Sequence, residues 1–208
     1  MYDGEKLNSI THLVGAILAL VGFGALLTIS IQERNPLLIV SFTVFGLTLI
    51  LLYTMSTLYH SFHPPRLKKL FQKLDHVSIY LLIAGTYTPY MLVSLREDSG
   101  LIMLMAVWIL AVVGLLLDIF ISKRVEWLQL VIYLVMGWIC TLNYSGLQAA
   151  VPAAAVVWLT MGGITYTVGI VFYVLDGRGK LRHAHGVWHL FVLSGSICHF
   201  ISIVGYVR

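Results

Sequence analysis

The sequence predicts an all-α membrane protein, a single domain over residues 1–208 built as a bundle of seven transmembrane helices. Hydrophobic residues make up 59% of the 208 positions and charged residues only 11%, so a water-soluble domain would have too little polar surface. The apolar residues also fall into seven runs, each near the length of about 20 residues that crosses a hydrocarbon core of roughly 30 Å as a helix.

The seven predicted spans follow one another with short polar breaks between them. The first run is too long for the hydrophobic region of a secretory signal and has no small-residue cleavage pattern after it, so we expect it to be a membrane helix. Pro89 should kink the third span. The spans are predicted at 11–31, 37–62, 76–95, 101–121, 127–144, 152–175 and 185–207. Between them lie QERNP, HPPRLKKLFQK, REDSG, SKRVE, NYSGLQAAVP and DGRGKLRH, which contain the Gly, Pro, Asn and Asp that end helices and form turns.

The basic residues predict how the bundle is oriented. If the N-terminus is cytoplasmic, ten of the 13 lysines and arginines lie on the cytoplasmic side, as the positive-inside rule requires. We therefore expect the C-terminus outside, and a positive charge that serves topology and membrane lipids rather than nucleic acid. The cytoplasmic set is Lys6, Arg66, Lys68, Lys69, Lys73, Lys123, Arg124, Arg178, Lys180 and Arg182, and the outer set is Arg34, Arg96 and Arg208.

Polar residues of the predicted spans gather at one end of the expected bundle. His185 and His189 are four residues apart at the start of the last span, and residues at that spacing share one face of a helix. The second span runs the opposite way and brings Ser56 and His60 to the same level, and Asp75 stands at the entrance of the third. Three distant segments thus place imidazoles and a carboxylate at one depth, where such groups are costly and usually functional.

This residue set has the donor atoms of a zinc site. Zinc favours imidazole nitrogen and carboxylate oxygen, and a catalytic zinc keeps three protein ligands and one open position. We predict His60, His185 and His189 as the ligands. Asp75 is then either a fourth ligand or a group that hydrogen-bonds a water on the metal, and Ser56 would orient that water or a substrate carbonyl. The alternative is a set of histidines that only reach toward the membrane surface.

The other histidines are weaker candidates. His12 and His76 lie near the same level and are candidates to support the ligands. His63 and His183 fall at helix ends, where a solvated imidazole is expected. His199 is ten residues past the last predicted ligand, roughly 15 Å along a helix, so it should pack between helices instead of sharing the ion.

Four segments carry a family resemblance that covers essentially the whole chain: GEKLNSITHLVG, STLYHSF, KLDHVSIYLLIAGTYTP and HGVWHLFVLSGSICHF. They resemble the hemolysin III family, the bacterial branch of the progestin and adipoQ receptor proteins. The family pattern of S-x-x-x-H, Asp and H-x-x-x-H maps onto Ser56, His60, Asp75, His185 and His189. The resemblance implies a zinc ion held by the three histidines, with the serine and the aspartate near a bound water. It also implies ceramidase-type hydrolysis of lipid amides, as in adiponectin-receptor relatives, and an inner cell membrane location.

These observations favour a zinc-dependent intramembrane hydrolase acting on a lipid amide or ester. A zinc ion can activate water and polarise a carbonyl, and Asp75 would be the general base. One alternative is a pore-forming hemolysin-type protein, although a channel needs polar residues along a path through the bilayer and those found here gather at one end. The other is a receptor or sensor in which zinc is structural. Membrane lipids are the expected partners, and the substrate and the oligomeric state are left open.

Overall fold

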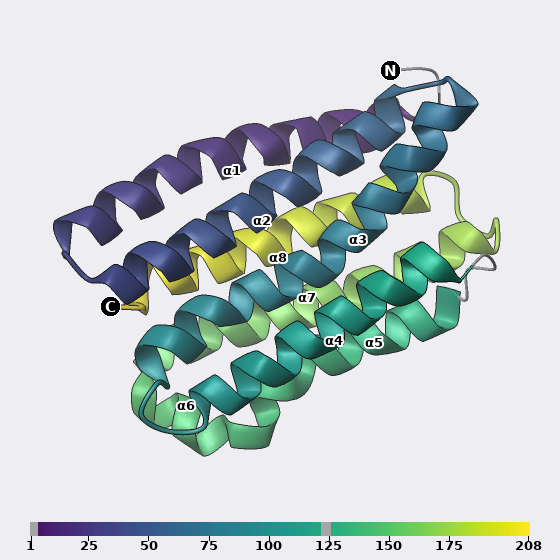
Figure 1. Ribbon diagram of the computed structural model, residues 1–208. Helices are drawn as coiled ribbons and strands as arrows, with labels where there is room; N and C mark the ends of the chain where they lie inside the picture. The colour runs from purple at the N-terminus through teal and green to yellow at the C-terminus, as the bar shows by residue number, and fades with distance from the viewer. Residues whose placement is uncertain (1–3, 122–125) are drawn as a thin grey trace.

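A computed structural model describes residues 4–121 and 126–208, and within them the chain forms a bundle of helices with no strand (Figure 1). Seven helical segments of this described part are long and apolar enough to cross a membrane, which confirms the predicted architecture. The elements are α1 (Lys6–Gln32), α2 (Pro36–Ser61), α3 (Pro65–Pro89), the π-helical turn η1 (Tyr90–Ser94), α4 (Gly100–Phe120), α5 (Glu126–Trp138), the 3-10 turn η2 (Ile139–Asn143), α6 (Tyr144–Ala150), α7 (Ala153–Gly177) and α8 (Ala184–Tyr206).

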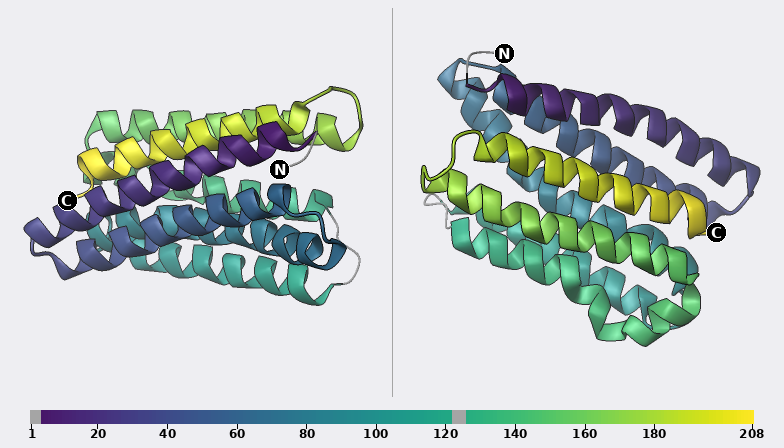
Figure 2. Two further views of the ribbon diagram at one scale, coloured as in Figure 1. Left: turned by 90° about the horizontal axis from the view of Figure 1, so that it is seen from above. Right: turned by 180° about the vertical axis from the view of Figure 1, so that it is seen from behind.

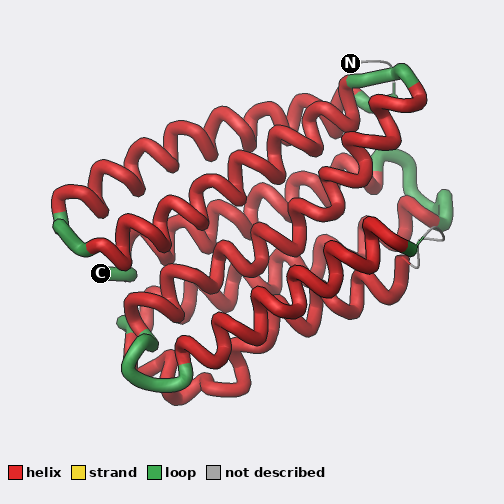
Figure 3. Tube along the Cα trace, viewed as in Figure 1, coloured by secondary structure: helices red, strands yellow, loops and turns green. Residues whose placement is uncertain are grey.

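Helices that are consecutive in the chain pack side by side, and α8 returns to lie against α1 as well as α7 (Figure 2). The start of α1, the end of α2 and the start of α8 therefore meet at one end of the bundle (Figure 1). The two chain termini lie at opposite ends, as an odd number of spans requires (Figure 3).

We call the end that holds the N-terminus the basic end. The lysines and arginines assigned to the cytoplasm that the structure describes belong to the start of α1, the start of α3 and the α7–α8 connection, and all three segments lie at this end (Figure 1). Lys123 and Arg124, assigned to the same side, lie outside the described residues. That the basic end faces the cytoplasm stays a prediction.

The third span begins earlier than the sequence pattern predicts. The predicted break HPPRLKKLFQK is helical from Pro65 onward, because proline fits the first turn of a helix and the leucines that follow recur at helical spacing. Leu67, Leu70 and Leu74 are partly exposed on this extension, which is amphipathic and not a turn. At its other end α3 changes to π-helical geometry directly after Pro89, where the sequence predicts an irregularity.

The fifth span is longer than predicted and broken in its middle. It continues to Ala150 through α6, and the turn η2 interrupts it. The Tyr87 hydroxyl donates to the Gly137 carbonyl oxygen at 2.9 Å and accepts from the Cys140 amide at 3.2 Å. The Tyr87 side chain of α3 thus forms hydrogen bonds with two backbone groups at the break. Inside a membrane such backbone groups need protein partners, because water does not reach them.

Candidate metal centre

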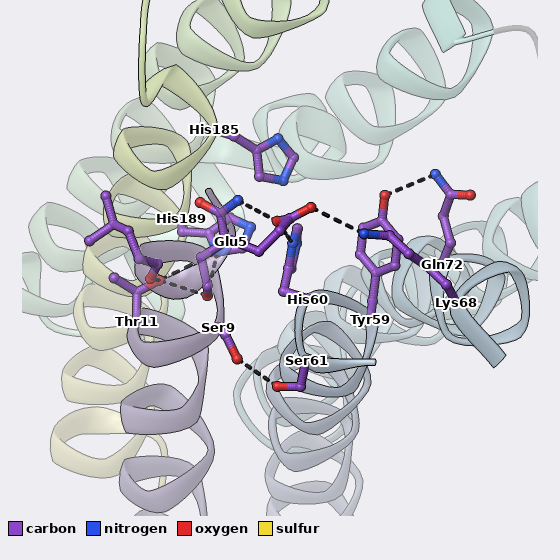
Figure 4. Close-up of polar contacts among 12 residues, drawn as sticks. Glu5, Ser9, Thr11, Tyr59, His60, Ser61, Lys68, Gln72, His185 and His189 are labelled. Carbon is purple, nitrogen blue, oxygen red and sulfur yellow. Dashed lines mark hydrogen bonds and ion pairs between the residues drawn. The ribbon is translucent and has the colours of Figure 1, made fainter. Parts of the chain in front are cut away.

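Three imidazoles converge at the basic end, where α2 ends and α8 begins (Figure 4). His60 lies in the last turn of α2, and His185 and His189 lie in the first two turns of α8. One nitrogen of each ring lies within 4.8 Å of the corresponding atoms of the other two. The structure therefore brings together the three histidines that the sequence predicts as ligands, in a group that could hold a metal ion.

The Nδ1 atom of each ring bonds to an oxygen outside the group. The contacts are His60 Nδ1 to Glu5 Oε2 at 2.6 Å, His185 Nδ1 to Asp176 Oδ2 at 3.1 Å and His189 Nδ1 to the Asn8 carbonyl oxygen at 3.1 Å. Since these oxygens are acceptors, each Nδ1 of a neutral ring carries the proton and each Nε2 keeps its lone pair. This arrangement orients histidines in metal sites and makes the other nitrogen a better ligand.

The three Nε2 atoms are buried and have no hydrogen-bond partner. His60 and His189 are almost fully buried, at 2% and 0% exposure. A buried acceptor without a partner costs free energy, and a cation bound by the three lone pairs would remove that cost. The donor set and its burial thus fit a metal ion held by three imidazole nitrogens.

Glu5 contacts the three-histidine group, and the sequence analysis does not predict this contact. Its carboxylate accepts from Asn8 Nδ2 at 2.8 Å and from Lys68 Nζ at 3.2 Å in addition to the His60 ring. Burial alone would raise the pKa of Glu5, but the hydrogen bonds and the charge of these partners lower it to about 2. The signal available in the sequence was an acidic residue at the start of an apolar helix, three residues before a polar one.

Asp176 also contacts the three-histidine group, although it falls in the segment DGRGKLRH that the sequence predicts as a connection. It lies in the last turn of α7, nine residues before the ring it bonds. The short α7–α8 connection brings its carboxylate back to His185. An acidic residue at the same membrane level as a ligand was again the usable signal.

Asp75 and Ser56 are both buried, and both lie outside the three-residue metal group. Ser56 is one turn before His60 on α2, and its hydroxyl has no hydrogen-bond partner. Asp75 lies near the start of the buried part of α3 and lines an internal cavity. Their predicted roles, with the aspartate as base and the serine as an orienting group, stay predictions.

The histidines outside the metal group are either exposed at helix ends or packed between helices. His63 and His183 are exposed, as predicted. His199 Nε2 contacts the Leu159 carbonyl oxygen at 3.1 Å, in keeping with a packing role. His12 stacks on the His189 ring.

A cavity of about 410 Å³ is lined by Asp75 and by His12, whose ring stacks on His189. Its wall comes mainly from α3, the fifth span, α7 and α8, and most of its lining is apolar. It reaches from Asp75 and Glu126 at the basic end to Leu147 of α6. A long apolar space that ends beside polar groups is a common form of ligand site.

Fold and site together define a multi-pass membrane protein with a buried three-histidine group able to hold a metal ion. The chain belongs to the haemolysin III family, because the family model described as "Haemolysin-III related" matches residues 2–200. This confirms the family that the sequence motifs indicated.

Individual relatives extend the match over nearly the whole chain. Hemolysin-3 of Bacillus cereus is 40% identical over 203 residues, covering 98% of this chain and 91% of the relative. The Hemolysin-3 homolog of Bacillus subtilis (strain 168) is 39% identical over 97% of this chain and 93% of its own. The human monocyte to macrophage differentiation factor, a progestin and adipoQ receptor type protein, is 28% identical over 96% of this chain and 82% of its own.

Proposed function

We propose that this protein is a zinc-dependent hydrolase of the inner cell membrane that cleaves an amide or ester bond in a lipid. The observation that carries the proposal is the set of three buried, unpartnered Nε2 atoms, each on a ring whose Nδ1 is held by another group. Three ligands leave a fourth position open, which is typical of catalytic and not structural zinc.

The chain's own residues have separate tasks in this proposal. Zinc, when bound, would activate a water molecule and polarise the carbonyl of the substrate. Glu5 and Asp176 hold the imidazoles of His60 and His185 in place. The Asp75 carboxylate takes a proton from the attacking water and passes it to the leaving group. Ser56 Oγ, one turn below the ligand on α2, donates a hydrogen bond that orients the carbonyl.

The cavity supports a lipid as the substrate. Its wall is largely apolar and passes through the bundle between helices that are long enough to span a membrane. An acyl chain could lie there while the bond to be cleaved stays near Asp75 at the basic end. The lysines and arginines at this end would attract an anionic head group or surface.

The same features argue against the two alternatives. A pore needs a polar path through the whole bilayer, and the cavity lining is mostly apolar. A purely structural zinc would be expected to have four protein ligands, whereas the group found among the described residues has three.

The metal content of the detergent-purified protein tests the proposal first. We expect about one zinc per chain by elemental mass spectrometry, and none when His185 and His189 are both replaced by alanine. His63→Ala is the matched control, because this histidine is exposed at the same end of the bundle, and it should keep the metal. A wild type that takes up no zinc when zinc is supplied would refute the proposal, and conductance in lipid bilayers after metal removal would favour a pore.

A further inference from the structure

His12 is held rigidly beside the three-histidine group although it is not part of it. Its ring stacks on His189 with the centroids 3.6 Å apart and the planes 10° from parallel. The Tyr53 ring meets it edge to face at 5.1 Å and 89°. With 2% exposure, the imidazole has little freedom to turn, so its two nitrogens point in fixed directions.

Neither ring nitrogen of His12 has a hydrogen-bond partner, and both are buried. A neutral imidazole carries one N–H donor and one acceptor lone pair, and leaving them unpaired in an apolar interior costs free energy. The polar neighbours on α1 are engaged elsewhere: Ser9 Oγ lies 2.6 Å from Ser61 Oγ, and Thr11 Oγ1 donates to the Leu7 carbonyl oxygen at 2.9 Å.

A molecule bound in the cavity would lie against His12, because this residue is one of those that line the cavity. The other two histidines of the lining differ from it. His199 has a contact with the Leu159 carbonyl oxygen and His76 has one with the Gln72 carbonyl oxygen. Within the described part of the lining, His12 is thus the histidine whose ring nitrogens no protein group satisfies.

We propose that His12 is a substrate-binding residue whose imidazole hydrogen-bonds the polar group of the lipid in the cavity. The carbonyl or N–H of an amide-like group would meet the ring nitrogens of His12, and the aliphatic chain would extend along the apolar wall. Stacking on His189 places this polar group next to the proposed metal ligands. The inference rests on the proposed function for the chemical class of the lipid. It adds a hydrogen bond from His12, which is neither a proposed metal ligand nor one of the two proposed catalytic residues, Asp75 and Ser56.

Hexadecylurea is a suitable probe, because its urea group offers the carbonyl and N–H groups of an amide but resists hydrolysis. Its binding to the zinc-supplemented, full-length protein in nanodiscs is measured with tritiated probe, and unlabelled hexadecane serves as the competitor that lacks the polar group. The wild type should bind the urea more tightly than the hydrocarbon. His12→Phe, which keeps an aromatic ring for stacking, should bind hexadecylurea about tenfold more weakly and hexadecane as before.

Two further variants control for damage to the fold. His12→Gln restores a donor and an acceptor and should recover part of the affinity for the urea. His199→Phe alters a histidine of the same cavity that already has a protein partner, and it should leave the preference for the urea unchanged. Zinc content, measured on each variant, should match that of the wild type.

The inference is overturned if His12→Phe binds hexadecylurea as tightly as the wild type, or if the wild type shows no preference for the urea over the hydrocarbon. It is also overturned if His199→Phe loses the preference to the same extent. Because binding is measured without turnover, a protein that binds the urea through His12 but hydrolyses no lipid would refute the hydrolase and keep the binding residue.

Discussion

The second and fifth spans show two ways in which a helix can belong to this bundle. In its most apolar part, α2 has 50% of its residues buried against the rest of the protein, whereas the fifth span has 11%. The second span is tied at its end to α1 through Ser9 and Ser61 and through the Glu5 contact with His60. The fifth span is broken at η2 and forms one wall of the cavity.

The two spans differ in how accurately their side chains must be positioned. A metal group requires its ligand atoms to be held within tenths of an ångström, which hydrogen bonds between α1, α2 and α8 can achieve. A wall for an aliphatic chain needs only apolar surface of the right shape. Substitutions near the second span should therefore change metal binding or turnover, and substitutions in the fifth span should change stability without loss of metal.

The largest effect should come from Asp75→Ala, on α3 between these two regions. Removal of a general base should lower turnover of a lipid amide by about 100-fold to 10,000-fold. The zinc content should stay at the wild-type level, because Asp75 lies outside the three-histidine group. Loss of zinc in this variant would make the aspartate a ligand, and full activity would remove it from the mechanism.

A smaller effect is expected for Glu5→Gln, which would weaken the contact that orients His60 while keeping the size of the side chain. Zinc affinity should fall by about 10-fold to 100-fold, as is usual when the partner of a ligating histidine is changed. Competition with a chelator measures the affinity. Glu33→Gln is the matched control, since this glutamate lies at the other end of α1 and its side chain is 51% exposed. An equal loss in both variants would contradict the assignment.

The pH dependence of stability in the metal-free protein tests the same contact between Glu5 and His60. Hydrogen bonds and neighbouring charge outweigh the effect of burial and lower the pKa of Glu5 from 4.5 to about 2. Since the folded-state pKa is the lower one, the carboxylate stabilises the fold above about pH 4.5, and this contribution is lost as the pH falls toward 2. Thermal unfolding of wild type and Glu5→Gln should therefore converge over this range, and a constant difference in Tm would contradict the prediction.

The sequence predicts the spans and the histidines well for physical reasons. Membrane thickness dictates the length of an apolar run, and helical spacing puts His185 and His189 on one face. The basic extension of α3 is helical where the sequence predicts a break, because its charged residues lie on a helix whose leucines continue the helical spacing. Polar composition alone does not separate an amphipathic helix at the membrane surface from a turn.

The hydrogen-bond partners of the histidines cannot be predicted from the sequence, for a different reason. Glu5 acts on a ring 55 residues away, and Asp176 acts on His185 across the turn that ends α7, so both depend on how the chain folds back. The break of the fifth span likewise depends on Tyr87, a residue of another helix. The spacing of polar residues in the sequence can predict which side chains lie at the same membrane depth, but it cannot predict which of these side chains are in contact.

The smallest effect, and the test of the fifth span, is Tyr87→Phe. The change removes the hydroxyl that joins the Gly137 carbonyl oxygen to the Cys140 amide, and it keeps the ring that lines the cavity. We expect a loss of about 1 kcal/mol in unfolding free energy, measured in mixed micelles, with the zinc content unchanged. Tyr53→Phe is the corresponding variant in the second span, because the Tyr53 hydroxyl donates a hydrogen bond to Ser196 Oγ at 2.7 Å. If Tyr87→Phe released zinc, the fifth span would be coupled to the metal group, and the division between a precise site and a tolerant wall would fail.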